Sequence, residues 1–276
     1  RGAMIHHELE VASCTDTGKV RPYNDDSVAV DAAAGIAAIA DGMALRRGAD
    51  VASRIATAEL LERLRRESGT SPERAVREAF SAIDRAIHEQ AQKNVSMQGM
   101  ATTLVAAWFR GERVSIAHVG DSRLYRFRDG QLERLTIDHS FVQEQLSAGT
   151  LTNSEARLSQ SRHLVTRALG TSEGVAPDLS EHEVRPGDIY LLCSDGLHDL
   201  VDDSDIALAL ETLQPNIGLA AATLVHMAND RGGLDNISVV IVRVKNGRSK
   251  TQAASARDRQ SAHPGLFGWL GRILGR

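Results

Sequence analysis

The chain has 276 residues, of which 42% are hydrophobic and 25% charged, with a formal net charge of −4 and an isoelectric point near 6.2. These values describe an ordinary water-soluble protein with enough aliphatic residues for a sizeable core, and they give no reason to expect binding to nucleic acid. The sequence shows no long apolar span and no signal peptide, so we expect neither membrane spanning nor secretion.

Two cysteines, Cys14 and Cys193, lie far apart in strand-like runs. We expect both to be free thiols buried in the fold, because two distant cysteines do not make a disulfide framework. Free thiols favour a reducing compartment, and the expected location is therefore the cytoplasm.

Strands and then helices are expected in the first half of the chain. Short strands around a polar turn occupy residues 8–39, and two helices follow within 48–92, where apolar residues recur at helical spacing opposite Glu and Arg. The second helix is expected to begin at Ser71, a capping residue followed by proline and glutamate. Strands return in MATTLVAAWF, RVSIAHVG and SRLYRFRDGQLERL, with a hairpin turn at Asp129-Gly130.

The second half begins with a polar segment, residues 138–172, that carries short helical patterns. We interpret it as a flap inserted into the domain. Strands resume in HEVRPGDIYLLCSDG, a helix fits GLAAATLVHMANDR, and the last strand is NISVVIVRV. Strands at both ends with paired helices between them predict an α+β sandwich, with sheets inside and helices outside.

The character of the sequence changes at Lys245. Residues 245–263 are polar and have the composition of a disordered linker, whereas 264–276 repeat apolar residues at helical spacing. From Lys245 onward there are seven basic residues and one acidic residue. Three interpretations stay open for this C-terminal segment. It is a short amphipathic helix on an anionic membrane surface, at the inner face of the membrane, a helix that docks on the core or on a partner protein, or an inert end that binds nothing.

Four strand-like runs stop at an aspartate that is followed by a small or turn-forming residue: Asp41 in AAIADG, Asp121 in IAHVGDS, Asp195 in YLLCSDG and Asp235 in GGLDNISVVIV. A single Asp-Gly of this kind is usually no more than a turn. Four of them, with the Asp-Asp pair of VRPYNDDS nearby, instead indicate carboxylates converging on hard divalent cations. A two-metal site of this kind points to phosphoryl chemistry.

Seven blocks occur in a fixed order: VRPYNDDS, ADGM, MATTLVAA, HVGDSRLYRFRDGQLERLTIDHS, LVTRALG, GDIYLLCSDGLHDLVDD and DNISVVIV. This ordered set resembles the bacterial protein phosphatase 2C enzymes, metal-dependent Ser/Thr phosphatases of the PPM class. The resemblance extends over residues 12–244. It implies one phosphatase domain, residues 4–244, with a four-layer α-β-β-α sandwich of two antiparallel sheets flanked by helix pairs.

The resemblance also implies a centre of two Mn²⁺ or Mg²⁺ ions. In that family's pattern, Asp41 bridges both metals and Gly42 offers its backbone carbonyl to one of them. Asp195 and Asp235 are further carboxylate ligands, and Asp25 completes one metal's coordination shell.

Two further roles follow from the same resemblance. Asp121 matches the ligand of a third, weaker ion, shared with Asp195. Arg21 matches the arginine that binds the substrate phosphate, and a guanidinium suits that task because its planar donors pair with phosphate oxygens. The implied catalytic residues are Arg21, Asp41, Asp195 and Asp235.

The sequence departs from the family's usual pattern just after Asp41. Where bacterial members read DGMGG, this chain reads DGMALRRG, so that Ala44 and Leu45 replace two glycines and Arg46 and Arg47 follow. Ala101 also stands where glycine is usual. Because glycine serves positions of positive φ or close approach, we expect these changes to strain or reshape the loop.

The expected function is hydrolysis of phosphoserine and phosphothreonine in proteins by a metal-activated water. The expected partners are phosphoprotein substrates and a Ser/Thr kinase that the enzyme opposes, with no nucleic acid and a monomeric core. One alternative is a catalytically weakened regulatory module that binds phosphoproteins or a kinase. A phosphatase for an anti-sigma-type regulator is another, with the same chemistry and a different substrate.

Overall fold

The computed structural model describes residues 8–44, 46–67, 69–152, 155–156, 159, 161, 163–171 and 174–245. The predictions for the linker after Lys245 and for the segment 264–276 therefore lie outside the described residues.

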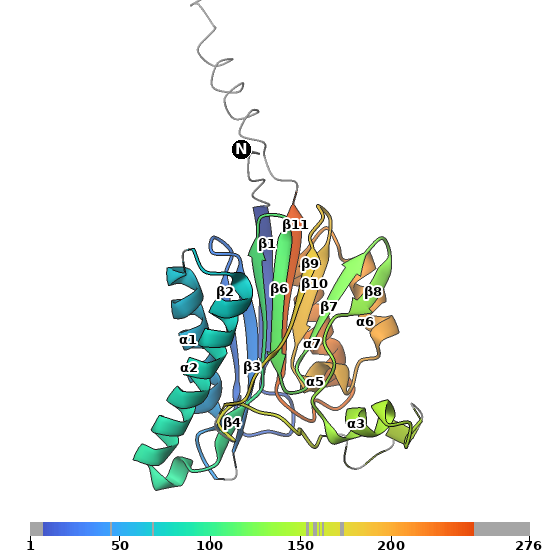
Figure 1. Ribbon diagram of the computed structural model, residues 1–276. Helices are drawn as coiled ribbons and strands as arrows, with labels where there is room; N and C mark the ends of the chain where they lie inside the picture. The colour runs from blue at the N-terminus through green and yellow to red at the C-terminus, as the bar shows by residue number, and fades with distance from the viewer. Residues whose placement is uncertain are drawn as a thin grey trace, which may run out of the picture.

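The described residues form two antiparallel sheets that pack face to face (Figure 1). One has the strand order β1-β11-β10-β7-β8, and the other has the order β2-β3-β5-β6-β9, with β4 paired to β3. The strands are β1 (Glu8–Asp16), β2 (Asp26–Asp31), β3 (Ile36–Ala44), β4 (Met100–Thr102), β5 (Leu104–Arg110), β6 (Arg113–Val119), β7 (Arg123–Arg128), β8 (Gln131–Arg134), β9 (Asp178–Glu183), β10 (Ile189–Cys193) and β11 (Ile237–Lys245).

Helices cover the outer face of each sheet (Figure 1). Two long helices lie on the sheet that contains β3, and another pair lies on the sheet that contains β11. The helical elements are α1 (Ala49–Arg66), α2 (Pro72–Lys93), η1 (Val95–Met97), α3 (Phe141–Ser147), α5 (Asp195–His198), α6 (Asp203–Thr212) and α7 (Ile217–Asp230). The sequence did not lead us to expect α6.

Strand alternation divides the core into three layers of apolar contact. On β3, Ala38 and Ala40 face α1 and α2, whereas Ile39 between them faces the other sheet. On β10, Leu191 faces α6 and α7, whereas Leu192 faces the space between the sheets. Period-two alternation of buried residues on both faces is what two helix-covered sheets require. The structure confirms the predicted α+β, four-layer α-β-β-α architecture.

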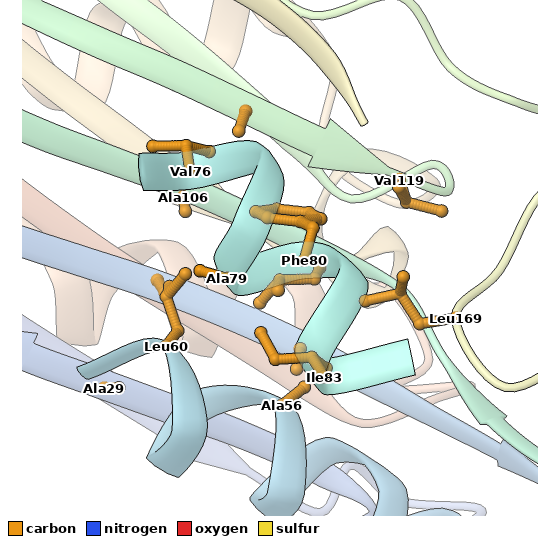
Figure 2. Packing of buried hydrophobic residues seen from close by; sticks show 14 of the residues in the cluster. Ala29, Ala56, Leu60, Val76, Ala79, Phe80, Ile83, Ala106, Val119 and Leu169 are labelled. Atoms are coloured by element: carbon orange, nitrogen blue, oxygen red, sulfur yellow. The ribbon is translucent and has the colours of Figure 1, made fainter. Parts of the chain in front are cut away.

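The helix layer over β3 and β5 is packed mainly by apolar side chains. Figure 2 shows Phe80 and Ile83 of α2 meeting Leu60 of α1 and Ala106 of β5, all of them buried. Small residues on the strands allow the helices to approach closely. This packing fixes α1, whose first residues lie beside the cavity described below.

Local signals in the sequence act as expected at two boundaries. The side chain of Ser71 accepts a hydrogen bond from the backbone N–H of Arg74, and Pro72 begins α2. Asp129 (φ 51°) and Gly130 (φ 77°) form the turn between β7 and β8. Both residues have positive φ, as a two-residue hairpin turn of this kind demands.

The expectation that the strand stops at Asp41 is wrong. β3 continues to Ala44 by exchanging partners: Ile36–Ile39 pair with β5, and Gly42–Ala44 pair with β4. Asp41 lies between the two pairings. An aspartate in the middle of a strand is held more rigidly than one in a turn, because backbone hydrogen bonds fix the chain on both sides of it.

Both cysteines are free thiols, with Cys193 buried and Cys14 half-buried, close to expectation. Within the part of the chain that is described, no helix has both the length and the apolar character needed to cross a membrane.

Candidate metal centre

One cavity of about 1090 Å³ lies where the ends of both sheets meet, and all seven residues predicted for the site line it. They come from five separate segments: the β1–β2 loop, β3, the β6–β7 turn, the start of α5 and the loop before β11. The seven are Arg21, Asp25, Asp41, Gly42, Asp121, Asp195 and Asp235. In Figure 1 this end is the lower one, near β4 and α5.

Asp41 lines the cavity and is fixed through its backbone. Its carbonyl oxygen accepts hydrogen bonds from the Thr103 N–H (2.9 Å) and the Thr102 hydroxyl (2.8 Å), and its own N–H donates to the Thr103 hydroxyl (3.1 Å). The next residue must be glycine: a Cβ on Gly42 would lie 2.1 Å from the carbonyl oxygen of Ala49. The close approach of α1 to β3 therefore depends on Gly42.

Asn236 ties together the segments that carry Asp25 and Asp235. Its side-chain oxygen accepts from the Asp25 N–H (2.8 Å), and its amide nitrogen donates to the carbonyls of Thr17 (2.9 Å) and Tyr23 (2.8 Å). Its backbone N–H donates to the Asp235 carboxylate (2.8 Å). The sequence singled out this Asp-Asn pair, but the reasoning gave a role to the aspartate alone.

Asp195 begins the single helical turn α5, directly after the buried strand β10. Its Oδ1 atom is buried and has no hydrogen-bond partner among the described residues. Gly196 allows the tight packing there, since a Cβ would lie 2.0 Å from the carbonyl oxygen of Asn236. Asp121 lies opposite, on the turn after β6, with its backbone carbonyl 3.1 Å from Nε2 of His198.

Four carboxyl groups that line this cavity have raised pKa values when no cation is present. Burial raises the pKa of Asp41 and of Asp195 well above the usual value, and neighbouring carboxylates raise both further. Burial raises the pKa of Asp121 to about 7, with Asp138 adding to the shift. Burial also raises the pKa of Asp25. Like charges crowded at low dielectric have this effect.

Asp26 is a member of the cluster that the sequence reasoning did not assign. It pairs directly with Asp41 across β2 and β3, one Oδ accepts from the Ser194 hydroxyl (2.8 Å), and the other is buried without a partner in the described structure. Burial raises its pKa to about 6. Of the Asp-Asp pair, Asp25 lines the cavity, whereas Asp26 is not among its lining residues and lies across from Asp41 in the β2–β3 pairing.

This donor set fits hard divalent cations. The oxygens come from rigid segments, and the buried Oδ1 of Asp195 lacks a partner among the described residues. Hard cations prefer oxygen ligands of this kind. His163 adds a nitrogen at the edge: one ligand atom each from His163, Asp195 and Asp199 lie within 4.8 Å of one another.

The structure does not show the expected strain at Ala44. Ala44 lies in β3 opposite Met100, and Ala101 pairs with Met43. Among the described non-glycine residues, positive φ occurs only at Asp129. Both alanines are therefore in extended backbone, which any residue can adopt. Leu45 lies outside the described residues.

Comparisons with known proteins agree on one family. The family model described as protein phosphatase 2C matches residues 17–226. The serine/threonine protein phosphatase PstP of Mycobacterium tuberculosis is 40% identical over 242 residues, covering 88% of this chain and 46% of the relative. The protein phosphatase PhpP of Streptococcus pneumoniae is 34% identical over 244 residues, covering 85% of this chain and 97% of the relative.

A solved structure agrees as well. The catalytic domain of the serine/threonine phosphatase PstP, in complex with two manganese ions, superposes with a TM-score of 0.80 at 38% identity, covering 87% of this chain and all of that one. The chain spans about half the length of the mycobacterial relative that it matches.

The pH dependence of stability tests the electrostatics of the cavity. A carboxyl with a folded-state pKa above its unfolded value keeps a proton that the unfolded chain has lost, so the metal-free protein loses stability as pH rises from about 4 to about 7. Replacing Asp121→Asn should remove part of that loss and stabilise the metal-free protein at pH 8 by roughly 2–4 kcal/mol. Thermal unfolding in EDTA measures it. Asp129→Asn, in an exposed turn, is the control, and an unchanged pH slope in Asp121→Asn would contradict the prediction.

Asn236→Ala tests the connection between the loops. It removes three side-chain hydrogen bonds at a buried position, and we expect a loss of roughly 2–4 kcal/mol in the free energy of unfolding. Denaturant unfolding measures the loss, and Asn94→Ala, at an exposed cap, serves as the comparison. If both variants lose the same amount, Asn236 does not hold these segments.

Proposed function

The chain belongs to the protein phosphatase 2C family, and on this basis we propose that it hydrolyses phosphoserine and phosphothreonine in proteins. One observation carries the proposal: Arg21 and five aspartates from five segments line a single cavity. Relatives named as serine/threonine protein phosphatases support it.

We assign the metal ligands by the family's pattern. Asp41, Asp195, Asp235, Asp25 and the carbonyl of Gly42 would hold two Mn²⁺ or Mg²⁺ ions. The relative solved with two manganese ions supports this number for this chain. A third, weaker ion would lie between Asp121 and Asp195. When bound, divalent cations supply an activated water nucleophile and stabilise charge on the phosphate oxygens.

Arg21 would bind the phosphate of the substrate. Its side chain is 55% exposed at the cavity, and Nη2 donates to Asp235 at 2.6 Å. This hydrogen bond raises the pKa of Arg21, so the guanidinium stays charged. The N–H groups of Arg21 that take no part in this hydrogen bond can pair with phosphate oxygens. The loop that carries Arg21 is anchored nearby, where the Lys19 N–H donates to the carbonyl of Gly233 (2.7 Å).

Asp26, Thr102 and Thr103 would act by positioning. Their hydrogen bonds and pairing hold Asp41 in one place, so little reorganisation is needed when substrate binds. Asp26 would also take up a proton at mildly acidic pH in the metal-free state, because burial raises its pKa to about 6.

We further propose that residues 4–244 form one phosphatase domain with a flap at 138–172, and that the core is a monomer. The pairing of β1 with β11, from Glu8 with Lys245 to Asp16 with Ile237, supports a single domain, because the first and last described strands lie next to each other in one sheet. A cytoplasmic location is supported by two free cysteines. The substrates would be proteins phosphorylated by a Ser/Thr kinase that this enzyme opposes, and a substrate related to an anti-sigma-type regulator would use the same chemistry.

The alternative of a weakened regulatory module draws less support from the structure. The motivation for this alternative was the ALRR sequence after Met43, which we expected to strain the loop. Ala44 of that sequence instead has regular strand backbone, so the expected strain is not found there.

Activity with and without metal is the direct test. Wild-type protein should turn over para-nitrophenyl phosphate and a phosphothreonine peptide with Mn²⁺ or Mg²⁺ and lose turnover in EDTA. Asp41→Asn should lower turnover by about 10²-fold or more, because it removes the carboxylate shared by both ions. Asp230→Asn, on the exposed end of α7, is the control. The proposed function would be contradicted if the wild type in EDTA and the Asp41→Asn variant with metal both turned over substrate as fast as the wild type with metal.

The C-terminal segment 264–276 lies outside the described residues, and we propose that it docks on an anionic membrane surface or on a partner protein. A variant that ends at Lys245 should lose sedimentation with anionic liposomes or partner binding and keep turnover of para-nitrophenyl phosphate. Liposomes of neutral lipid provide the control. Unchanged binding by the shortened variant would show that the segment does not dock.

A further inference from the structure

Four arginines line the metal cavity together with the carboxylates: Arg21, Arg46, Arg47 and Arg54. Two of them already have acidic partners. Arg21 pairs with Asp235 at 2.6 Å, and Arg54 pairs with Asp50 at 2.6 Å, one helical turn away on α1. Their charge is therefore offset within the protein.

Arg46 and Arg47 differ from these two. Both are exposed, and neither forms an ion pair with a carboxylate in the described structure, although six aspartates line the same cavity. Two adjacent guanidinium groups at the edge of a concave site raise the local concentration of anions. Their charge is available to a ligand.

The backbone holds this pair close to the reaction site. Arg46 and Arg47 follow β3, which carries Asp41 and Gly42, and precede Gly48, whose φ of 99° turns the chain into α1. The Ala52 N–H donates to the carbonyl of Gly48 (2.9 Å), which fixes that turn. Arg46 is five residues after Asp41 in the chain, so their Cα atoms are at most about 17 Å apart.

The cavity is larger than one phosphorylated side chain requires. Its volume of about 1090 Å³ is at the top of the range for sites that enclose whole drug-sized ligands. Residues next to the phosphorylated one would therefore enter with it and meet the wall that carries Arg46 and Arg47.

We propose that Arg46 and Arg47 form a second anion subsite, which binds an acidic group of the substrate chain next to the phosphorylated residue. The acidic group is either an Asp or Glu carboxylate or a second phosphate. This assignment rests on the proposed phosphatase function and makes it specific, because it selects phosphoproteins with acidic or multiply phosphorylated sequences.

The chemistry of the pair determines what it changes. Guanidinium groups donate paired hydrogen bonds to carboxylate and phosphate, so they favour binding of the substrate chain rather than the displacement at phosphorus. The effect should therefore fall on KM. Because both arginines are solvent-exposed, it should also weaken as ionic strength rises.

Turnover of matched phosphothreonine peptides tests the subsite in the full chain with Mn²⁺. One peptide has neutral neighbours, one has Asp and Glu, one has Lys, and one carries a second phosphothreonine. Wild type should prefer the acidic and doubly phosphorylated peptides about threefold to tenfold in kcat/KM, through KM. The ratio should fall to about one in R46A/R47A and favour the lysine peptide in R46E/R47E. The relative preference for Asp and Glu against a second phosphate distinguishes the two sources.

Arg66→Ala is the matched control, because Arg66 lies at the other end of α1, 78% exposed and paired with Glu62. It should keep the preference of wild type. An equal acidic-to-neutral ratio in wild type and R46A/R47A would overturn the subsite, even if para-nitrophenyl phosphate is turned over as the proposed function requires. If no substrate is turned over, the phosphatase proposal fails, and fluorescence anisotropy of the same peptides on metal-free protein decides about the subsite. Tighter binding of acidic peptides that R46A/R47A abolishes would support it, and equal binding would refute it.

Discussion

The structure depends on one electrostatic constraint. Several carboxyl groups lie together in one cavity, where they cannot all ionise unless a cation binds between them. Asp121 is buried, and Asp41 and Asp195 are half-buried beside the same cavity. Desolvation raises the pKa of each of the three, and repulsion from neighbouring carboxylates raises it further. A fold can retain such a destabilising arrangement because a bound cation offsets the repulsion between the carboxylates. The stability of the metal-free protein is thus reduced in exchange for a preformed set of oxygen ligands.

The rest of the fold keeps this set in place. Helices packed on both outer faces make two stacked sheets rigid, and the exchange of β3 from β5 to β4 places Asp41 where Thr102 and Thr103 hold its backbone. Asn236 joins loops that are more than 200 residues apart in sequence. Because the ligands come from five segments, the site exists only when both sheets are complete. Specificity can then vary independently, since Arg46 and Arg47 lie on a loop at the edge.

Local patterns predicted an α+β sandwich and four of the aspartates of the cavity, whereas the four layers and the roles of Arg21, Asp25 and Gly42 came from the resemblance to protein phosphatase 2C enzymes. Apolar alternation marks the buried strands, and aspartate after an apolar run marks Asp121 and Asp195. The sequence did not predict the role of Asp26, since one of two adjacent aspartates faces the cavity and only the strand register decides which. It also placed strain at Ala44, where the pairing of β3 with β4 produces ordinary extended backbone. The partner exchange at Asp41 is a tertiary feature with no local signal.

Calorimetric titration of the metal-free protein with Mn²⁺ at pH 6.5, in buffers of different ionisation enthalpy, tests the constraint most directly. Because the pKa of Asp121 is raised to about 7 and that of Asp26 to about 6, cation binding should displace protons from the cluster. The account predicts at least two Mn²⁺ ions per chain and a measurable release of protons as they bind. Fewer than two ions, or binding without proton release, would contradict it.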